Sequence, residues 1–410
     1  MFLMLSLGRQ ALDARAREAP DYAATAPVTI KVLRSVSEVE GIRDAWTQMQ
    51  RHPNADIDFF LNVVESRPQI LRPHVVVLSR DGRPTAILAG RIENRFLESK
   101  FGYKVIHRSP VVGLTVIYGG LLGDFSPSNS TLIMKCLVKS LADQEADLIW
   151  FNGIRSDSPM YQIGRRASGV LFSDFAPELN LHWKVNLPGS YEQFLQSLSS
   201  KTRYNLRAYS SRLLKTFGKA LSVRCFRQKT ELDQIVHDTE FVAAKTYHRG
   251  LGVGFVDDAE TRRLTAFSLE RGWFRAYILY VGGTPCAFWH GLQYGRTFFT
   301  GCTGSDPAYR EHRLGTCLLT KVFEDLCRDA GVGEVDFGLG DAEYKRHLCN
   351  QSWLEASAYV FAPTIRGLAL NSLRTPFLLV DRSARRVVGR SGLLTKIKTL
   401  WRKRAAQTLC

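Results

Sequence analysis

The sequence has no long apolar run and, over two long stretches, no acidic residue. No run reaches the roughly 18 apolar residues that a membrane-spanning helix needs. A short apolar patch at residues 2–7 has no basic residue before it and ends at Gly8-Arg9, too soon for a signal peptide. We therefore expect a cytoplasmic protein that is soluble or bound peripherally to a membrane.

Paired cysteines are also missing. None of the eight cysteines forms a Cys-x-x-Cys pair, and several fall within apolar helical or strand patterns. This spacing argues against a zinc site and against a disulfide framework. The cysteines are typical of small core residues in a reducing compartment, and we expect no metal site.

Acidic residues are absent from residues 193–230 and from residues 384–404, and the formal net charge is +16. An excess of positive charge favours anionic partners, namely phosphorylated cofactors, nucleic acid or anionic lipid. Apolar residues make up 45% of the 410 residues, which is ordinary for a globular protein of two to three domains.

One unit of the chain occurs twice. Residues 74–79, 85–91 and 113–122 predict strands, 128–144 a helix and 147–151 a further strand, and the same order recurs from 276 to 337. At an offset of 201, identical residues coincide: Gly82 with Gly283, Pro84 with Pro285, Ala86 with Ala287, Gly90 with Gly291, and Arg95 with Arg296. Two copies of one unit are the simplest account.

The copies differ at the loop before the helix. The second copy has Arg310, Arg313 and Gly315 in this loop, where a helix start would offer free N–H groups and a positive dipole end to a phosphate. The first copy has no arginine there, and Ser126 and Pro127 predict an ordinary helix cap. We therefore interpret the first copy as structural or substrate-lining and the second as the active one.

Two motifs carry a family resemblance. The loop Arg313-Leu314-Gly315-Thr316 resembles the pyrophosphate cradle of the GNAT acyltransferases, although Arg313-Leu314-Gly315 stands where Ser-Pro-Gly is usual. The run Asp336-Phe337-Gly338, Gly340-Asp341 and Tyr344-Lys345 resembles the signature of their BioF2-like or CelD-like branch, which is similar to the FemAB transferases.

The resemblance implies an α+β fold of tandem GNAT-like domains, each a mixed, mostly antiparallel sheet flanked by helices. The expected divisions are a tail (1–27), a degenerate GNAT-like domain (28–180), an active one (181–365) and a basic amphipathic tail (366–410). It also implies acetyl-CoA or another acyl-CoA as donor and an amine or hydroxyl acceptor, for example a glycan precursor. The expected cofactor-binding residues are Arg310, Arg313, Leu314, Gly315 and Thr316.

Acyl transfer requires groups that move protons. The candidate catalytic residues are Asp306, His290, Asp341, Tyr344 and Lys345. Tyr344 could protonate the leaving thiolate, and Lys345 could orient an acceptor. Each has a plainer alternative: His290 as a buried strand histidine, Asp306 as a turn cap, and the loop after 340 as polar surface.

The basic stretches allow further interpretations. Lys201, Arg203 and Arg207 could bind an acceptor's phosphate or carboxylate, or could form a solvated helix face. Residues 384–404 could contact anionic membrane, dock on the protein or form a tail. Two functions compete with acyl-CoA transfer: a FemAB-like aminoacyl-tRNA-dependent transferase, the one case in which nucleic acid would be a partner, and a non-catalytic basic adaptor.

Overall fold

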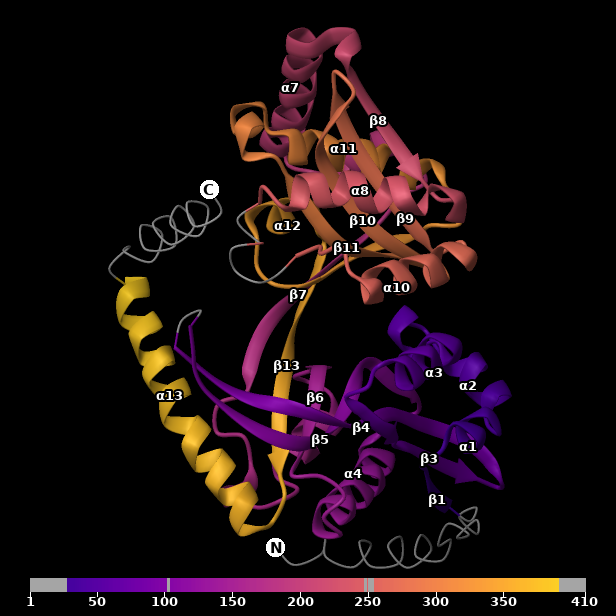
Figure 1. The fold of residues 1–410 in the computed structure, drawn as a ribbon, viewed down its shortest axis with the longest axis vertical. Coiled ribbons are helices and arrows are strands. Elements are labelled where there is room, and N and C mark those ends of the chain that lie inside the picture. The colour runs from indigo at the N-terminus through magenta and orange to yellow at the C-terminus, as the bar shows by residue number, and fades with distance from the viewer. Residues whose placement is uncertain (1–27, 102–103, 247–248, 250–253, 391–410) are drawn as a thin grey trace, which may run out of the picture.

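The computed structural model describes residues 28–101, 104–246, 249 and 254–390. Figure 1 shows two lobes joined by two long strands. The N-terminal lobe contains β1 (Val28–Leu33), α1 (Val36–Glu40), α2 (Arg43–Met49), η1 (Pro53–Ala55), α3 (Ile57–Ser66), β2 (Ile70–Pro73), β3 (Val75–Arg80), β4 (Arg83–Phe101), β5 (Lys104–Gly123), α4 (Pro127–Ala142), β6 (Leu148–Arg155), α5 (Pro159–Gly164) and η2 (Val170–Phe172).

The C-terminal lobe follows the first of the two joining strands. After β7 (Glu178–Asn186) come α6 (Tyr191–Ser197), α7 (Ser200–Phe217), η3 (Gly218–Ala220), β8 (Leu221–Phe226), η4 (Lys229–Glu231), α8 (Leu232–Ala243), α10 (Ala259–Glu270), β9 (Phe274–Val281), β10 (Thr284–Tyr294), β11 (Thr297–Ser305), η5 (Pro307–His312), α11 (Leu314–Arg328), β12 (Glu334–Leu339) and α12 (Glu343–Leu348). The second joining strand is β13 (Gln351–Phe361), and α13 (Ile365–Arg390) ends the described chain.

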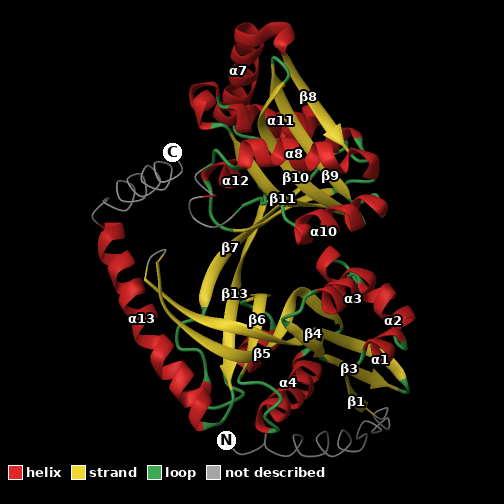
Figure 2. Ribbon diagram, viewed as in Figure 1, coloured by secondary structure: helices red, strands yellow, loops and turns green. Residues whose placement is uncertain are grey.

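All the strands belong to one sheet of 13 strands, in the order β1-β3-β4-β5-β6-β13-β7-β12-β11-β10-β9-β8, with β2 paired to β4. Among the described pairings only β5–β6 and β11–β12 are parallel. Helices flank this sheet in both lobes (Figure 2). The predicted α+β class, with a mixed and mostly antiparallel sheet, is confirmed.

Strands β7 and β13 make the sheet continuous from lobe to lobe. Strand β13 follows the C-terminal lobe in sequence, yet it pairs with β6 of the N-terminal lobe on one side and with β7 on the other. Strand β7 in turn pairs with β12. The expected boundary between residues 180 and 181 falls inside β7, so the two lobes share backbone hydrogen bonds at that point.

The predicted repeat is visible in the strand register. The β3–β4 turn has Asp81 at φ 49° and Gly82 at φ 73°, and the β9–β10 turn has Gly282 at φ 58° and Gly283 at φ 81°. Positive φ at both central residues defines the type I′ hairpin turn. The cross-strand pairs beside the two turns are also equivalent. In the first copy Ser79 pairs with Pro84 and Leu78 with Ala86. In the second copy, 201 residues later, Tyr280 pairs with Pro285 and Leu279 with Ala287.

Each lobe also contains a fork, by which we mean the point where its two parallel strands diverge. In the N-terminal lobe, β5 and β6 pair only from Gly113–Leu148 to Val116–Phe151, and both strands then continue apart. In the C-terminal lobe, β11 and β12 pair only from Thr297–Glu334 to Phe299–Asp336. A strand pair that separates leaves a gap between two backbones, which is where a ligand can enter a sheet.

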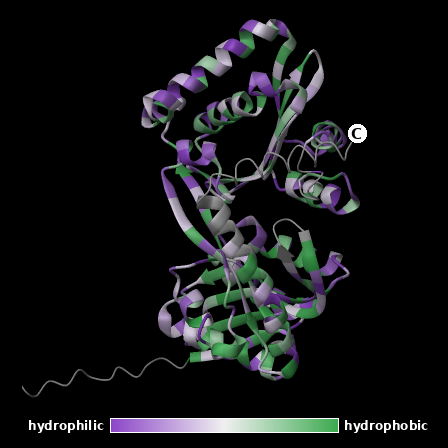
Figure 3. Ribbon diagram, turned by 90° about the vertical axis from the view of Figure 1, so that its left-hand side faces the viewer, coloured by the Kyte–Doolittle hydropathy of each residue, from purple (hydrophilic) through white to green (hydrophobic). Residues whose placement is uncertain are grey.

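Apolar side chains form a core on each face of the sheet in both lobes, and Figure 3 colours many strand residues of the N-terminal lobe as hydrophobic. In the N-terminal lobe α4 covers one face and α2 and α3 cover the other, whereas in the C-terminal lobe α11 and α8 take opposite faces. The fully buried side chains on these helices include Ile133 and Leu137 on α4, Trp46 and Phe60 on α2 and α3, Leu318 on α11, and Ile235 and Val242 on α8.

Glycine is required where β10 passes over Phe298. A Cβ at Gly291 would lie 2.2 Å from Phe298 Cζ, inside van der Waals contact with a fully buried ring.

Gly291→Ala is expected to lower the free energy of unfolding by about 1–3 kcal/mol through overpacking. Urea denaturation should show this loss and its partial recovery in a Gly291→Ala/Phe298→Leu double variant. The control is Gly189→Ala, where a Cβ would meet nothing within 4 Å; an equal loss in the control would contradict the explanation.

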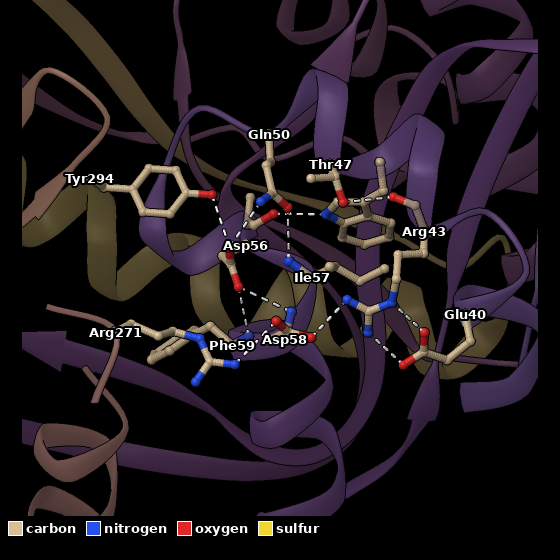
Figure 4. Close-up of polar contacts among 12 residues, drawn as sticks. Glu40, Arg43, Thr47, Gln50, Asp56, Ile57, Asp58, Phe59, Arg271 and Tyr294 are labelled. Carbon is tan, nitrogen blue, oxygen red and sulfur yellow. Dashed lines mark hydrogen bonds and ion pairs between the residues drawn. The ribbon is translucent and has the colours of Figure 1, made fainter. Parts of the chain in front are cut away.

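Side-chain contacts tie the lobes together as well. Tyr294 on β10 donates its hydroxyl to Asp56 Oδ2 at 3.0 Å, and Arg271 donates to Asp58 Oδ2 at 3.1 Å. Figure 4 shows that Asp58 also accepts a hydrogen bond from Arg43, so the Asp58 carboxylate joins residues from both lobes. Together with β7 and β13, these contacts hold the two lobes at a defined separation.

No helix of the described chain is long and apolar enough to cross a membrane. Helix α13 reaches Arg390 and carries exposed apolar side chains such as Leu379 and Val380. The predicted basic segment 384–404 lies partly beyond residue 390, and residues 391–410 lie outside the described part of the chain.

Candidate functional site

The start of α11 is open to a ligand. Arg313 takes the N-cap position in a left-handed conformation (φ 55°, ψ 38°), and no side chain caps the helix. No described residue accepts a hydrogen bond from the backbone N–H of Leu314 or of Gly315. Uncapped N–H groups at the positive end of a helix dipole form an anion-binding site.

Two exposed arginines flank this helix start. Neither Arg310 nor Arg313 forms an ion pair with a described carboxylate, and the Arg313 guanidinium lies 5.7 Å from the centre of the Tyr209 ring on α7. Arg310, Arg313 and Gly315 thus lie around one uncapped helix start, and their binding of a cofactor stays a prediction.

The other two predicted cofactor-binding residues turn inward. Leu314 is 2% exposed and packs in the core beneath α11, which leaves only its backbone available to a ligand. Thr316 is half-buried and donates its backbone N–H to Arg313 O at 3.0 Å. We refer to residues 310–316 as the cradle.

The matching helix start in the N-terminal lobe is closed by an acid. The Asp124 carboxylate accepts the backbone N–H of Ser126 at 2.9 Å and the side-chain amide of Asn129 at 2.8 Å. The predicted Ser126 cap is wrong in detail, because Ser126 is the N-cap residue of α4 but its side chain makes no capping bond. A carboxylate at this position would repel an external phosphate.

A bulge on β11 lies just beyond the C-terminal lobe fork. Trp289 on β10 pairs with Thr303 and Gly291 pairs with Thr300, which leaves Gly301 and Cys302 without partners on β10. Both bulged residues are exposed. A bulge turns backbone groups out of the ladder, so this segment can offer an N–H to a carbonyl oxygen.

Tyr344 spans this fork. Its ring packs edge-on against Trp289 of β10 at 6.1 Å and against Phe337 of β12 at 5.8 Å. Since β11 lies between these two strands, Tyr344 crosses the gap where β11 and β12 separate. The side chain is 36% exposed, so it is accessible from solvent.

Lys345 is placed differently from its expected role. Its side chain is 6% exposed, and Nζ donates to Phe337 O at 2.8 Å and to Leu339 O at 2.9 Å, with Gly338 O at 3.4 Å. Burial lowers the pKa of Lys345. The ammonium group thus holds the backbone at the end of β12, and it is not free to orient an acceptor.

Lys345→Met is expected to lower the free energy of unfolding by about 1–3 kcal/mol, because it leaves buried carbonyls without a donor while keeping the side-chain volume. Urea denaturation measures the loss. Lys321→Met is the matched control, since the Lys321 side chain is 48% exposed and, among the described residues, forms an ion pair with Glu324 alone. Equal stabilities of the two variants would contradict a structural role for Lys345.

The candidate bases at residues 290 and 306 are both engaged. His290 is 4% exposed, its Nε2 lies 2.9 Å from Thr239 Oγ1, and burial lowers its pKa to about 3. Asp306 accepts the backbone N–H of Ala308 at 2.9 Å and pairs with Lys245 at 2.8 Å. His290 has the position of a packed, neutral strand histidine, and Asp306 that of a turn cap.

The remaining predicted residues lie in the loop before α12 and on α7. Asp341, in that loop, pairs with Arg346 on α12. On α7, Arg207 pairs with Glu192 at 3.1 Å and Arg203 donates to Leu195 O at 3.4 Å, so both arginines turn toward α6.

Helix α7 meets the cradle region through its C-terminal half. Phe217, at its C-terminal end, packs against Tyr309 and His312 of η5 at 6.0 and 4.9 Å. Lys201 is exposed at the opposite, N-terminal end of this helix, away from that contact.

A buried charged cluster, absent from the sequence prediction, lies where β7 and β13 pass between the lobes. His182 on β7 has Nε2 at 2.8 Å from Asp336 Oδ1 of β12 and Nδ1 at 3.2 Å from Glu355 Oε1 of β13. The Tyr118 hydroxyl of β5 lies 3.0 Å from the same Nδ1, and the Trp353 ring stacks on the imidazole at 4.3 Å. Both forks thus contribute to this cluster, through Tyr118 and Asp336.

The charges of the cluster follow from its contacts. Burial opposes the charged form of His182, but its contacts with Asp336 and Glu355 prevail and raise its pKa to about 9. Burial likewise opposes the charged form of Glu355, yet the bonds from His182 hold its pKa below the usual range. Burial raises the pKa of Tyr118, so that the phenol stays neutral. The cluster is an imidazolium between two carboxylates at neutral pH.

One feature of the sequence could have indicated this cluster. Glu355 is an acid in the middle of the mostly apolar strand 351–361, and a charge in such a strand is buried only with partners. Its partner His182 lies 173 residues upstream (355 minus 182), a separation that no local pattern reveals. Among the described residues, no group of three or more His, Cys, Asp or Glu side chains is arranged to hold a metal ion.

Comparison with known proteins agrees with this geometry. Residues 200–346 match the family model described as an acetyltransferase (GNAT) domain. No curated protein matches the chain. The solved structure of FemX is similar at a TM-score of 0.52 and 11% identity, over 84% of this chain and 99% of FemX.

Two further solved structures are similar at lower scores. The C-terminal domain of a putative lysylphosphatidylglycerol synthetase from Agrobacterium fabrum has a TM-score of 0.47 at 13% identity, over 82% of this chain and 95% of that one. A GCN5-related N-acetyltransferase from Sphaerobacter thermophilus has a TM-score of 0.42 at 13% identity, over 83% and 98%. Within the C-terminal lobe, residues 200–346 are therefore similar to the GNAT acetyltransferase domain that the family model describes.

Proposed function

We propose that this protein is an acyl-CoA-dependent N- or O-acyltransferase whose donor binds at the cradle of the C-terminal lobe. The observation that carries the proposal is the uncapped start of α11, flanked by Arg310 and Arg313, which pair with no described carboxylate. Pyrophosphate matches this site, because it is an anion that accepts several hydrogen bonds at once.

The residues around the cradle fit an acyl-CoA donor. The free N–H groups of Leu314 and Gly315 and the two arginines can hold the pyrophosphate, and the exposed basic residues of α7 can meet further phosphate. Beyond Phe299 the edge of β11 that faces β12 is no longer paired with it, and an extended arm of the donor would lie along that edge. The donor supplies an activated acyl group as a thioester.

Acyl transfer forms a bond from the acceptor nitrogen or oxygen to the acyl carbon and breaks the carbon–sulfur bond. A backbone N–H at the bulge Gly301–Cys302 would stabilise negative charge on the acyl oxygen. Tyr344 would give a proton to the leaving thiolate, and the proton that the acceptor nitrogen or oxygen loses would restore the phenol through solvent. The two lobes would hold donor and acceptor next to each other, which lowers the entropic part of the barrier.

The resemblance of the 336–345 run to the BioF2-like or CelD-like branch extends the proposal to acceptors from polysaccharide or cell-envelope biosynthesis.

The second candidate donor is an aminoacyl-tRNA. It is favoured by the exposed Lys201, Arg212 and Lys215 on the surface of α7, which form no ion pair with a described carboxylate. Such a surface would bind a polyanion with strong salt dependence.

The test is calorimetric titration of acetyl-CoA and of free CoA into the full chain, alongside an aminoacyl-tRNA at two salt concentrations. Binding of both CoA compounds is expected, with an affinity that falls moderately as salt is added. Salt-dependent binding of aminoacyl-tRNA without binding of CoA would replace the acyl-CoA proposal with the tRNA-dependent one.

A further inference from the structure

Helix α13 directs apolar side chains to solvent along one face. Ile365 is 90% exposed and Leu373 is 51% exposed, and both belong to a stripe of residues spaced three or four apart, which share a face of a helix. We call this stripe the outer face of α13. Its exposed residues are Ile365, Leu368, Ala369, Ser372, Leu373, Pro376, Leu379 and Val380.

The polar side chains of α13 point toward the protein instead. Asn371 is buried and donates its side-chain amide to the backbone carbonyls of Leu171 and Ser173, each at 2.9 Å. Arg374 is the only charged residue between 367 and 380, and it is buried against Asp174 at 2.8 Å. Turning the helix to bury its leucines would break this ion pair, so the fold fixes the outward direction of the apolar face.

This orientation is the reverse of what water alone favours. A helix on the surface of a soluble protein normally buries its apolar face, because that burial stabilises the fold while the burial of charge is costly. Figure 1 shows α13 along the outer side of the N-terminal lobe. A continuous apolar stripe exposed in such a place is typical of an interaction surface.

The short helix η2 extends this surface and adds positive charge to it. Val170 and Leu171 are exposed beside α13, to which Asn371 ties their backbone. Arg165 and Arg166 precede them, are exposed, and form no ion pair with a described carboxylate. The end of α13, residues 381–390, contains four arginines and one aspartate in its sequence. Basic residues therefore adjoin the apolar surface.

This combination distinguishes between two possible occupants. A second copy of the chain, docked symmetrically, would bring the same arginines of both copies together with few acids to pair them, and like charges at an interface disfavour association. An anionic lipid surface offers both acyl chains for the leucines and phosphates for the arginines. Charge complementarity thus favours the lipid surface.

We propose that the outer face of α13, together with Val170 and Leu171, docks the protein on an anionic membrane. The helix would lie in the plane of the membrane interface without crossing it, with its apolar side chains among the lipids and Arg165 and Arg166 beside lipid phosphate. The inference does not depend on the proposed function, because it requires neither a donor nor an acceptor.

The experiment is vesicle flotation of the full chain with phosphatidylcholine vesicles, alone or mixed with phosphatidylglycerol. Wild type is expected to bind the mixed vesicles at least about tenfold more tightly than the neutral ones. Leu373→Glu is expected to weaken binding to the mixed vesicles at least about tenfold, because it puts a carboxylate into the apolar contact. The variant should fold, since the side chain that it replaces is exposed.

Leu214→Glu is the matched control, because Leu214 is 56% exposed on α7 and the substitution adds the same charge away from the outer face. It is expected to bind the mixed vesicles nearly as wild type does. Equal weakening by the two variants, or no binding by wild type, would overturn the inference. So would unchanged binding by Leu373→Glu, which keeps residues 384–404 intact and would assign the lipid contact to that basic segment.

Arg165→Gln/Arg166→Gln tests the charged part of the surface and is expected to reduce the preference for phosphatidylglycerol several-fold. An unchanged preference would contradict the contact of these arginines with lipid phosphate. Sedimentation velocity without vesicles tests the alternative occupant, and wild type and Leu373→Glu are expected to have the same mass. A wild-type dimer that Leu373→Glu dissociates, without vesicle binding, would assign the face to a second copy and overturn the inference.

Discussion

Gly315→Glu is expected to weaken acetyl-CoA binding by about a hundredfold or more, equivalent to roughly 2.7 kcal/mol. The substitution puts a carboxylate at the first turn of α11, where the free N–H groups and the two arginines would otherwise receive pyrophosphate. Like charges a few ångströms apart repel strongly in a partly desolvated site. Calorimetric titration of acetyl-CoA into wild type and variant measures the loss.

The structure indicates that this variant should fold. A Cβ at Gly315 would lie 3.7 Å from Ser305 Oγ, an ordinary contact, and the backbone there is helical. An acid in the first turn of a helix also stabilises the helix itself. Gly189→Glu is the matched control, because it adds the same charge at an exposed site before α6. If Gly315→Glu bound acetyl-CoA as wild type does, the cradle would not be the donor site.

His182→Gln is expected to lower the free energy of unfolding by about 3 kcal/mol at pH 6. Removing the imidazolium leaves the buried Glu355 and the half-buried Asp336 without their shared partner, and breaking a buried charged pair from one side typically costs this much. The elevated pKa of His182 gives the same order of magnitude, since a rise from 6.5 to about 9 corresponds to up to about 3 kcal/mol.

The loss should depend on pH in a definite direction. A pKa raised in the folded state contributes stability that is fully present below pH 6.5 and is lost as pH rises through about 9. The difference between wild type and His182→Gln should therefore be largest near pH 6 and should shrink by pH 9.5. Urea denaturation at both pH values, followed by circular dichroism, measures this difference.

Subtracting the free energy of unfolding of His182→Gln from that of wild type cancels the contributions of other groups that titrate at alkaline pH, such as the buried cysteines. His347→Gln serves as control, because His347 is 55% exposed on α12 and its replacement should change stability little at either pH. A wild-type advantage over His182→Gln that stayed constant from pH 6 to 9.5 would show that His182 is uncharged in the folded protein.

Local chemistry along the chain determined much of the fold. The paired glycines Gly82 and Gly283 predicted two equivalent turns, because a type I′ turn requires positive φ, and the structure has that turn at both places. The sequence also predicted a helix after the loop that contains Arg310, Arg313 and Gly315, and the structure has α11 there. These features depend on residues within one or two turns of each other.

Tertiary structure decided the rest. Periodicity cannot tell which strand a strand will pair with, so the insertion of β13 between β6 and β7 could not be predicted from the sequence. That pairing brings Glu355 to His182, and the protonation of both follows from their contact and burial. For the same reason Lys345, which the sequence placed beside an acceptor, holds backbone carbonyls, and His290 lies neutral among aromatic rings. The sequence by itself determined the elements, the repeat and the cradle, whereas long-range pairing determined which charges are buried and what they face.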